Sequence, residues 1–395
     1  MALSRRAFLT LLAGTGLLAP TVQAAPPRGT FALAGTVYPG QGAPLPGHAV
    51  LVRSGRIEDV VPAHAVTDRP IVAPENGSIL PGVINAHCHD LHTVRERRER
   101  WLDHGVTGIG DAASPLKFLP ALLDAPTGRT ASASACGPML CPPGGYPLPV
   151  HSPEHALSVA SPKEGADAVR RLADLGVRRI KIAFEPGSLP EAWPLFDPGT
   201  ARAICDAAHR LGLAVRCHVE DVSGLEPALD AGADCIEHVP HRWHEQGAIR
   251  PVLDPDGAPA PYYLRLLERM VRDGIIMTPT LDVFTRTPWN GPDLFAPVRA
   301  FHAMGGRIAL GNDFPYRRTD AGMPVREMRL LAEAGLDDTA VLQAATATAA
   351  EVCGFTDRGR IAPGMAADLL AVRGAPAQDA LQDPAHIVKD GVFIR

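Results

Sequence analysis

The chain has 395 residues, of which 46% are hydrophobic, and its 38 basic and 43 acidic residues give a net charge of -5 at pH 7. This length suits one large domain with an appendage, or two mid-sized domains. Since acidic and basic residues are interspersed and no basic patch is evident, we expect no nucleic-acid partner.

The first residues have the form of an export signal. Arg5 and Arg6 form a twin-arginine pattern. The apolar run over residues 11–20 follows, and the small residues at 22–24 suit cleavage by signal peptidase. We therefore expect residues 1–24 to be a twin-arginine signal peptide and the mature protein to be periplasmic. No other stretch is long and uncharged enough to span a membrane, so we expect no stable membrane insertion after signal removal.

Short β-like runs alternate with turns after the predicted signal, and similar runs return at the end of the chain. Neither part contains a convincing helical pattern. We therefore predict a small β-sandwich domain built from both termini. Residues 25–80 are its N-terminal part, and residues 361–395 are its C-terminal part.

Between these two parts, residues 81–360 alternate short apolar strands with helical segments. Several helical segments end just before Gly105, Gly176, Gly212 or Gly274, which is where a C-terminal glycine is expected. Eight such strand–helix units predict an α/β fold of the (β/α)₈ TIM-barrel type. The alternative is an open doubly wound sheet, but the Gly-x-Gly-x-x-Gly turn is missing after the first strand. The predicted strands are 83–86, 106–111, 130–137, 178–183, 213–217, 235–237, 275–278 and 307–311.

Polar residues fall at the predicted carboxyl ends of these strands, where a TIM barrel has its chemistry. His87 and His89 end the first strand and project to the same side, so their imidazoles can hold one metal ion. By alternation, Lys181 on the fourth strand faces the interior, where an ammonium is costly unless it is paired. Together these positions predict a metal site. Three further candidates end the fifth, sixth and eighth strands: His218, His238 and Asp313.

A series of motifs occurs in one order along the chain, at residues 80–89, 105–111, 179–182, 231–238, 278–281, 308–313 and 361–369. Through these motifs the sequence resembles the amidohydrolase superfamily, in the branch of imidazolonepropionase-like and Xaa-Pro dipeptidase-like proteins. The resemblance covers essentially all of the mature chain. It implies hydrolysis of a C–N bond, of the amide or peptide type, in a small molecule.

The resemblance also implies a binuclear site with two divalent metal ions. Zinc is expected, and manganese, iron and cobalt are alternatives. Lys181, carboxylated on its ε-nitrogen, would bridge both ions as a carbamate, which would also resolve the cost of its burial. An unmodified Lys181, with one metal or a weak second site, is the alternative. The remaining ligands would be His87, His89 and Asp313 for the more buried ion, and His218 and His238 for the second.

Such a site lowers the pKa of a water to make a hydroxide nucleophile, and it polarises the scissile carbonyl. Asp313 would take the proton from the nucleophile and give it to the leaving amine. No Ser or Cys nucleophile is needed, and Cys88 is interpreted as packing because alternation turns it away from the metal. Hydrolysis of lactones, carbamates or organophosphate esters is an alternative on the same site. A catalytically silent metal-binding or ligand-binding barrel is a third possibility.

Several positions bear on the substrate. Family members often carry Gly-Gly-His after strand three, whereas this chain has Tyr146 in place of that histidine. Tyr146 would hydrogen-bond the substrate carbonyl or wall the pocket. Glu220, two residues after His218, suggests the mononuclear deaminase-like branch, against which Lys181 argues. Three arginines in the loops after strands seven and eight are candidates to bind a substrate carboxylate: Arg286, Arg317 and Arg318.

The seven cysteines are an odd number, which in an exported protein leaves at least one free thiol. Cys136 and Cys141 share one loop region, and their pairing is left open by the sequence. The only partner that the sequence predicts is a small-molecule substrate. The sequence is also compatible with an oligomer.

Overall fold

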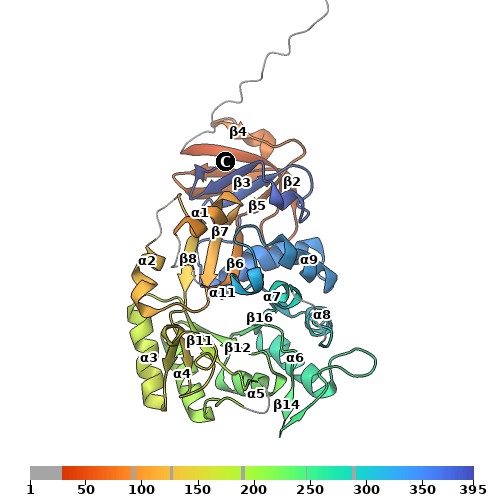
Figure 1. Ribbon diagram of the computed structural model, residues 1–395. Coiled ribbons are helices and arrows are strands. Elements are labelled where there is room, and N and C mark those ends of the chain that lie inside the picture. Colours follow the sequence, from red (N-terminus) through yellow and green to blue (C-terminus); the bar gives the residue numbers. More distant parts are fainter. Residues whose placement is uncertain are drawn as a thin grey trace, which may run out of the picture.

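The structure is a computed structural model, and it describes residues 29–89, 91, 95–124, 128–187, 192–245, 247–286 and 291–395. The predicted signal peptide lies outside the described residues. A sheet drawn in red-orange and dark blue forms one end of the molecule, and a larger α/β part follows it (Figure 1). Within the described ranges, the helices are too short or too polar to cross a membrane.

Strands from both ends of the chain join in a single sheet (Figure 1). Phe31 and Leu33 near the start of the chain share one apolar cluster with Val388 near its end. The two termini therefore form one β unit, while the two-sheet sandwich and the domain boundaries stay predictions. The order of the sheet is β20 (Val392–Phe393), β19 (His386–Lys389), β18 (Leu369–Val372), β5 (Ser78–Pro81), β1 (Thr30–Val37), β2 (Leu45–Arg53) and β3 (Arg56–Pro62), with β4 (Ile71–Val72) paired to β1.

The part between the termini has parallel strands in two sheets. The first sheet has the order β6 (Val83–Cys88), β7 (Val106–Asp111) and β8 (Ser132–Ala135). The second sheet has the order β10 (Ala156–Ser158), β9 (Met139–Cys141), β11 (Arg179–Ala183), β12 (Ala214–His218), β13 (Cys235–Glu237), β16 (Ile276–Thr278) and β17 (Arg307–Ile308).

Backbone hydrogen bonds connect both edges of the three-stranded sheet to the second sheet. The amide of Ala86 donates to the carbonyl of Leu310 at 2.8 Å, and the amide of Arg178 donates to the carbonyl of Ala135 at 3.1 Å. The fold is thus α/β of the TIM-barrel type, as predicted, and complete closure of the barrel stays a prediction. A two-stranded hairpin that the sequence did not predict, β14 (His244–Glu245) and β15 (Ala248–Ile249), extends from this part (Figure 1).

Local sequence signals set the ends of the helices. The side chain of Ser161 caps α3 by accepting from a backbone amide, and Asp197 caps α4 in the same way. Gly176, Gly212 and Gly274 have positive φ just beyond helices, as predicted. The helices are α1 (Arg95–Asp103), α2 (Leu119–Leu123), α3 (Pro162–Asp174), α4 (Pro198–Arg210), α5 (Val222–Ala231), α6 (Pro261–Asp273), α7 (Leu281–Thr285), α8 (Phe295–Ala303), α9 (Val325–Glu333), α10 (Asp338–Gln343) and α11 (Ala349–Cys353).

All seven cysteines lie among the described residues as buried free thiols. Cys136 and Cys141 are therefore not paired in this structure. Cys88 is fully buried in the main apolar cluster, which agrees with its interpretation as a packing residue.

Candidate metal centre

The first group of predicted ligands converges where β6 and β17 lead into loops. His87 and His89 lie at the end of β6, and their Nε2 atoms are 3.2 Å apart. Asp313 follows β17, and its Oδ1 lies 3.4 Å from Nε2 of His87 and 3.2 Å from Nε2 of His89. All three side chains are buried, and their ligand atoms lie within 4.8 Å of one another. This group has the spacing and the N/O donors that a divalent ion requires.

A second group lies beside the first. His218 ends β12 and His238 follows β13, and their ring centroids are 4.5 Å apart. The ring of His238 is 4.9 Å from that of His87, so the two groups adjoin. Glu220 completes the second group, whose ligand atoms also lie within 4.8 Å of one another. The sequence identified Glu220 only as the mark of an alternative branch, but the structure brings it to the site.

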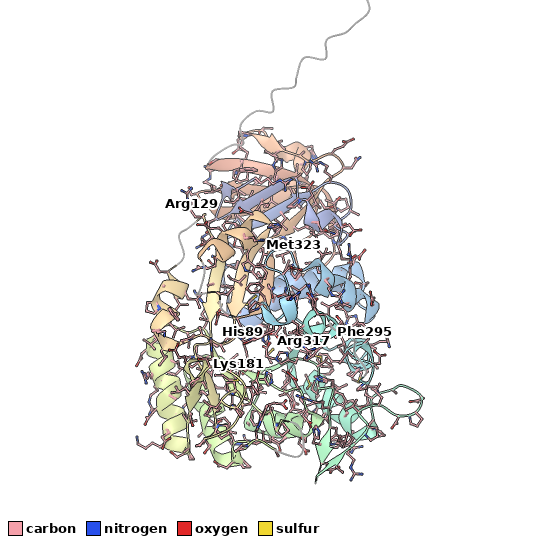
Figure 2. The ribbon with its side chains drawn as sticks, in the orientation of Figure 1. His89, Arg129, Lys181, Phe295, Arg317 and Met323 are labelled. Carbon is pink, nitrogen blue, oxygen red and sulfur yellow. The ribbon has the colours of Figure 1, made fainter. Side chains whose placement is uncertain are left out.

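Lys181, in β11, is the polar residue that both groups share. Its side chain is fully buried, and its Nζ has no hydrogen-bond partner. It interacts electrostatically with His87 and Asp313 of the first group and with His218 of the second. Burial, opposed by Glu237, lowers the pKa of Lys181. The prediction that Lys181 faces the interior is confirmed, because it lines the same cavity as the ligand groups. Figure 2 shows it close to His89.

The ring of His87 is held from behind by a buried ion pair. Its Nδ1 forms a short hydrogen bond with Glu237, whose other carboxylate oxygen accepts from Nε of Arg216 at 2.6 Å. Burial acts to raise the pKa of Glu237, but Arg216, Lys181 and His87 together hold it well below its usual range. A proton fixed on Nδ1 leaves the Nε2 lone pair of His87 for a metal ion. The sequence reasoning missed both Glu237 and Arg216.

Three residues that belong to the ligand groups or support them have the left-handed backbone that favours glycine. They are His238 at φ 73°, Thr280 at φ 51° and Asp313 at φ 56°. Such a conformation costs on the order of 1 kcal/mol or more, most for a β-branched residue such as Thr280, and it is concentrated at functional sites. Along β13, simple alternation would turn His238 opposite to Glu237. The left-handed turn allows both side chains to reach His87.

Thr280 and Glu327 hold this strained segment. Oγ1 of Thr280 lies 2.8 Å from Nδ1 of His238. This contact leaves Nε2 of His238 to bind a metal ion. The carboxylate of Glu327 accepts from the next two backbone amides, those of Leu281 at 3.0 Å and Asp282 at 2.6 Å. Burial, and the charge of Asp282, raise the pKa of Glu327 to about 8.

The two ligand groups open into a cavity of about 320 Å³. Tyr146 lines it, and its ring stacks on His218 at 4.2 Å between centroids with 16° between the planes. Burial raises the pKa of Tyr146 well above its ordinary value, so its hydroxyl keeps its proton as a donor. Apolar side chains form much of the remaining wall: Ala113, Met139, Val283 and Phe284.

Of the three predicted carboxylate-binding arginines, only Arg317 lines this cavity. Figure 2 shows it near His89 and Lys181. The prediction for Arg286 is wrong, because its guanidinium is engaged with Asp282 at 2.7 Å and with Asp320 at 3.0 Å. The guanidinium of Arg286 also donates to the carbonyl of Arg318. Its hydrogen bonds therefore hold the loop together instead of binding a ligand.

The donor set as a whole fits divalent metal ions. Burial lowers the pKa of His87 to about 4, and it lowers those of His218 and His238 well below the ordinary value. These imidazoles are therefore neutral near pH 7 and can offer lone pairs. His218 Nε2 and Lys181 Nζ are buried polar atoms without hydrogen-bond partners, which a metal ion or a modification would satisfy.

Comparisons with known proteins bear on the family and the fold of the chain. A family model described as "Amidohydrolase family" matches residues 141–393, which is more than half of the chain. A protein of Mycobacterium tuberculosis (strain ATCC 25618 / H37Rv), described as uncharacterized, is 26% identical over 356 residues, which are 80% of this chain and 85% of the relative.

Two further proteins that are similar to this chain are named for different activities. A 5-methylthioadenosine/S-adenosylhomocysteine deaminase of Natronomonas pharaonis is 23% identical over 82% of this chain and 80% of its own length. The crystal structure of a Xaa-Pro dipeptidase with bound methionine in the active site is 19% identical, with a TM-score of 0.73 over 93% of this chain and 100% of that chain. The structural likeness shows that the two chains share a fold.

Proposed function

We propose that this chain, which belongs to the amidohydrolase family, is a metal-dependent hydrolase. The bond that it cleaves is the C–N bond of an amide or a dipeptide in a small molecule. One observation carries the proposal. Two groups of potential ligands adjoin in a single cavity, and the partnerless amine of Lys181 interacts with both.

The cavity suits two divalent ions, with zinc the first choice. His87, His89 and Asp313 would hold one ion, and His218 and His238 the other. A carbamate on Lys181 would bridge them, and its negative charge would replace an unpaired buried amine. When bound, such ions lower the pKa of a water and polarise a carbonyl.

The side chains of the chain account for the proton movements. Water adds to the substrate carbonyl carbon, and Asp313, at the edge of the first group, takes a proton from that water. Asp313 then gives the proton to the amine nitrogen as the C–N bond breaks, which yields a carboxylic acid and an amine. Tyr146, which keeps its hydroxyl proton, would donate a hydrogen bond to the carbonyl oxygen.

A second candidate is hydrolytic deamination at a single metal ion. Glu220 supports it, because its carboxylate belongs to the group formed by His218 and His238, and its Oε1 lies 3.7 Å from Nε2 of His218. The resemblance to a deaminase also favours it. Lys181 argues against this candidate, because one ion would leave the buried amine without a partner.

The location of the protein and the closure of the barrel are part of the proposal. We propose export through the twin-arginine signal at residues 1–24, which would allow folded, metal-loaded protein to reach the periplasm. Closure of the eight strands into a barrel is supported by the hydrogen bonds that join both edges of the three-stranded sheet to the second sheet.

The proposal is tested with the mature protein, zinc and bicarbonate. The substrates are dipeptides, N-acyl amino acids, lactones and 5-methylthioadenosine. The expected result is release of an amine from a member of the first two classes. Release of ammonia from 5-methylthioadenosine would favour the deaminase candidate, and hydrolysis of lactones alone would overturn the assignment to C–N bonds.

A further inference from the structure

Three side chains outside the ligand groups form a hydrogen-bonded bridge, here called the Tyr–His–Tyr bridge: Tyr146, His151 and Tyr316. The hydroxyl of Tyr146 lies 3.1 Å from Nε2 of His151, and that of Tyr316 lies 3.4 Å from Nδ1 of the same ring. Tyr146 and His151 belong to the segment after β9, whereas Tyr316 follows β17. The bridge therefore connects loops from distant parts of the chain.

Each tyrosine of the bridge packs on a different ligand group. Tyr146 stacks on His218 of the second group, with centroids 4.2 Å apart. Tyr316 meets His89 of the first group edge-on, with centroids 5.1 Å apart. All three residues of the bridge also line the cavity. The bridge thus spans both ligand groups from the side of the cavity.

The hydrogen-bonding capacity of imidazole limits how the protons can be arranged. A neutral histidine has one N–H donor and one nitrogen acceptor. Both ring nitrogens of His151 face a phenol oxygen, so in the neutral form of the ring one tyrosine donates to it and the other accepts from it. The tyrosine that accepts retains its own O–H proton, which it can donate to another group in the cavity.

We propose that His151 is a positioning residue for amide hydrolysis, an inference that rests on the proposed function. With its proton on Nε2, His151 donates to Tyr146 and accepts from Tyr316. The hydroxyl proton of Tyr146 is then directed to the carbonyl oxygen of the substrate, where negative charge develops as water adds. Tyr146 has this role because its ring lies flat on His218 and its hydrogen bond to His151 is the shorter of the two.

The position of the proton on His151 can be measured without any substrate. Zinc-loaded protein labelled with ¹⁵N-histidine would be studied by NMR at pH 8, with the His151 signals assigned by their loss in His151→Gln. The expected result is a neutral ring with its proton on Nε2. A proton on Nδ1, or on both nitrogens, would overturn the proposal whether or not the protein hydrolyses any compound tested.

Kinetics on the best dipeptide of the panel give a second readout. Tyr146→Phe keeps the ring on His218 but removes the donor, so kcat should fall by about 100-fold or more with little change in KM. His151→Gln should lower kcat by about 10-fold in the native background, and it should have little effect when added to Tyr146→Phe, because its action passes through Tyr146.

A matched control for these variants is Tyr262→Phe, which removes a hydroxyl that donates to Glu226 at 2.9 Å outside the cavity. It should leave kcat and KM unchanged. Equal losses from His151→Gln in both backgrounds, or a change in KM alone, would contradict the positioning role. Absence of hydrolysis by the native protein would instead count against the proposed function, and the NMR result would still decide the position of the proton.

Discussion

At the scale of single residues, the first ligand group depends on the buried ion pair of Glu237 and Arg216. Glu237 is fully buried and accepts from Arg216, while it also orients His87. The second guanidinium nitrogen of Arg216 donates to the carbonyl of Ala86 at 2.7 Å, next to the ligand itself. This pair therefore joins three strands directly below the first ligand group, and its loss should affect stability as well as metal binding.

Replacing Glu237→Gln removes the carboxylate and leaves the guanidinium of Arg216 buried without a countercharge. The free energy of unfolding should fall by about 3–5 kcal/mol, as is typical when one partner of a buried pair is removed. Urea unfolding of the metal-free protein measures this loss separately from metal binding.

The matched control for that change is the double variant Glu237→Leu with Arg216→Met, which removes both charges. It should recover part of the lost stability, because no buried charge is left unpaired. A loss of less than about 1 kcal/mol for Glu237→Gln would contradict the role given to this pair.

The residues at the ends of strands could be predicted from the sequence, whereas the contact between the residues that support them, Glu237 and Arg216, could not. His87, Lys181 and His218 were identified from strand ends and alternation alone. Arg216 also follows from alternation, since it lies two residues before His218, but its partner Glu237 is on another strand. No local pattern predicts that contact, which depends on how β6, β12 and β13 approach one another in the fold.

At the scale of elements, the turn between β16 and α7 positions His238. Thr280 has an unfavourable backbone conformation there, and Glu327 of α9 holds the two amides that follow it. Because burial raises the pKa of Glu327 to about 8 from an ordinary 4.5, its proton is bound more tightly in the folded protein. Its contribution to stability is therefore complete below pH 4.5 and is lost as the pH rises through about 8.

Glu327→Gln should remove this pH dependence, because glutamine resembles the protonated acid and does not titrate. The unfolding free energy of the variant should stay flatter than that of the native protein between pH 4.5 and pH 8. Denaturation series across this range measure the difference, with Glu268→Gln, a substitution elsewhere on the chain, as control. Parallel profiles for the native protein and Glu327→Gln would show that Glu327 does not titrate there.

The elements themselves were largely predictable from the sequence. β7 and β13 have the bounds that were predicted. The short strands β9 and β10 and the β14–β15 hairpin were missed, because two or three residues carry too little periodicity to be recognised. Such strands form only because a neighbour offers paired backbone groups.

At the scale of the whole molecule, ligands for the two proposed ions come from strands along the length of the barrel-type part. β6, β11, β12, β13 and the segment after β17 all contribute. Ions that bind only the folded chain should therefore stabilise it as a unit. Zinc at 100 times its dissociation constant would contribute about 2.7 kcal/mol for each independent ion.

Chelation should accordingly lower the midpoint of thermal unfolding, and restored zinc should return it. Calorimetry of native, chelated and zinc-restored protein measures the change. The control is a His87→Ala, His218→Ala double variant, whose midpoint should respond little to zinc. Equal responses of the native protein and this variant would show that zinc stabilises the chain from a different site.

The proposed binuclear site, bridged by Lys181, is tested most directly by the metal content per chain. Purified native protein, supplied with zinc and bicarbonate and then dialysed, should retain two ions per chain, and intact-mass analysis should show one added carboxylate. Lys181→Ala should retain one ion or fewer, without the added mass. Equal zinc content in the native protein and Lys181→Ala, or no retained zinc in either, would contradict the account.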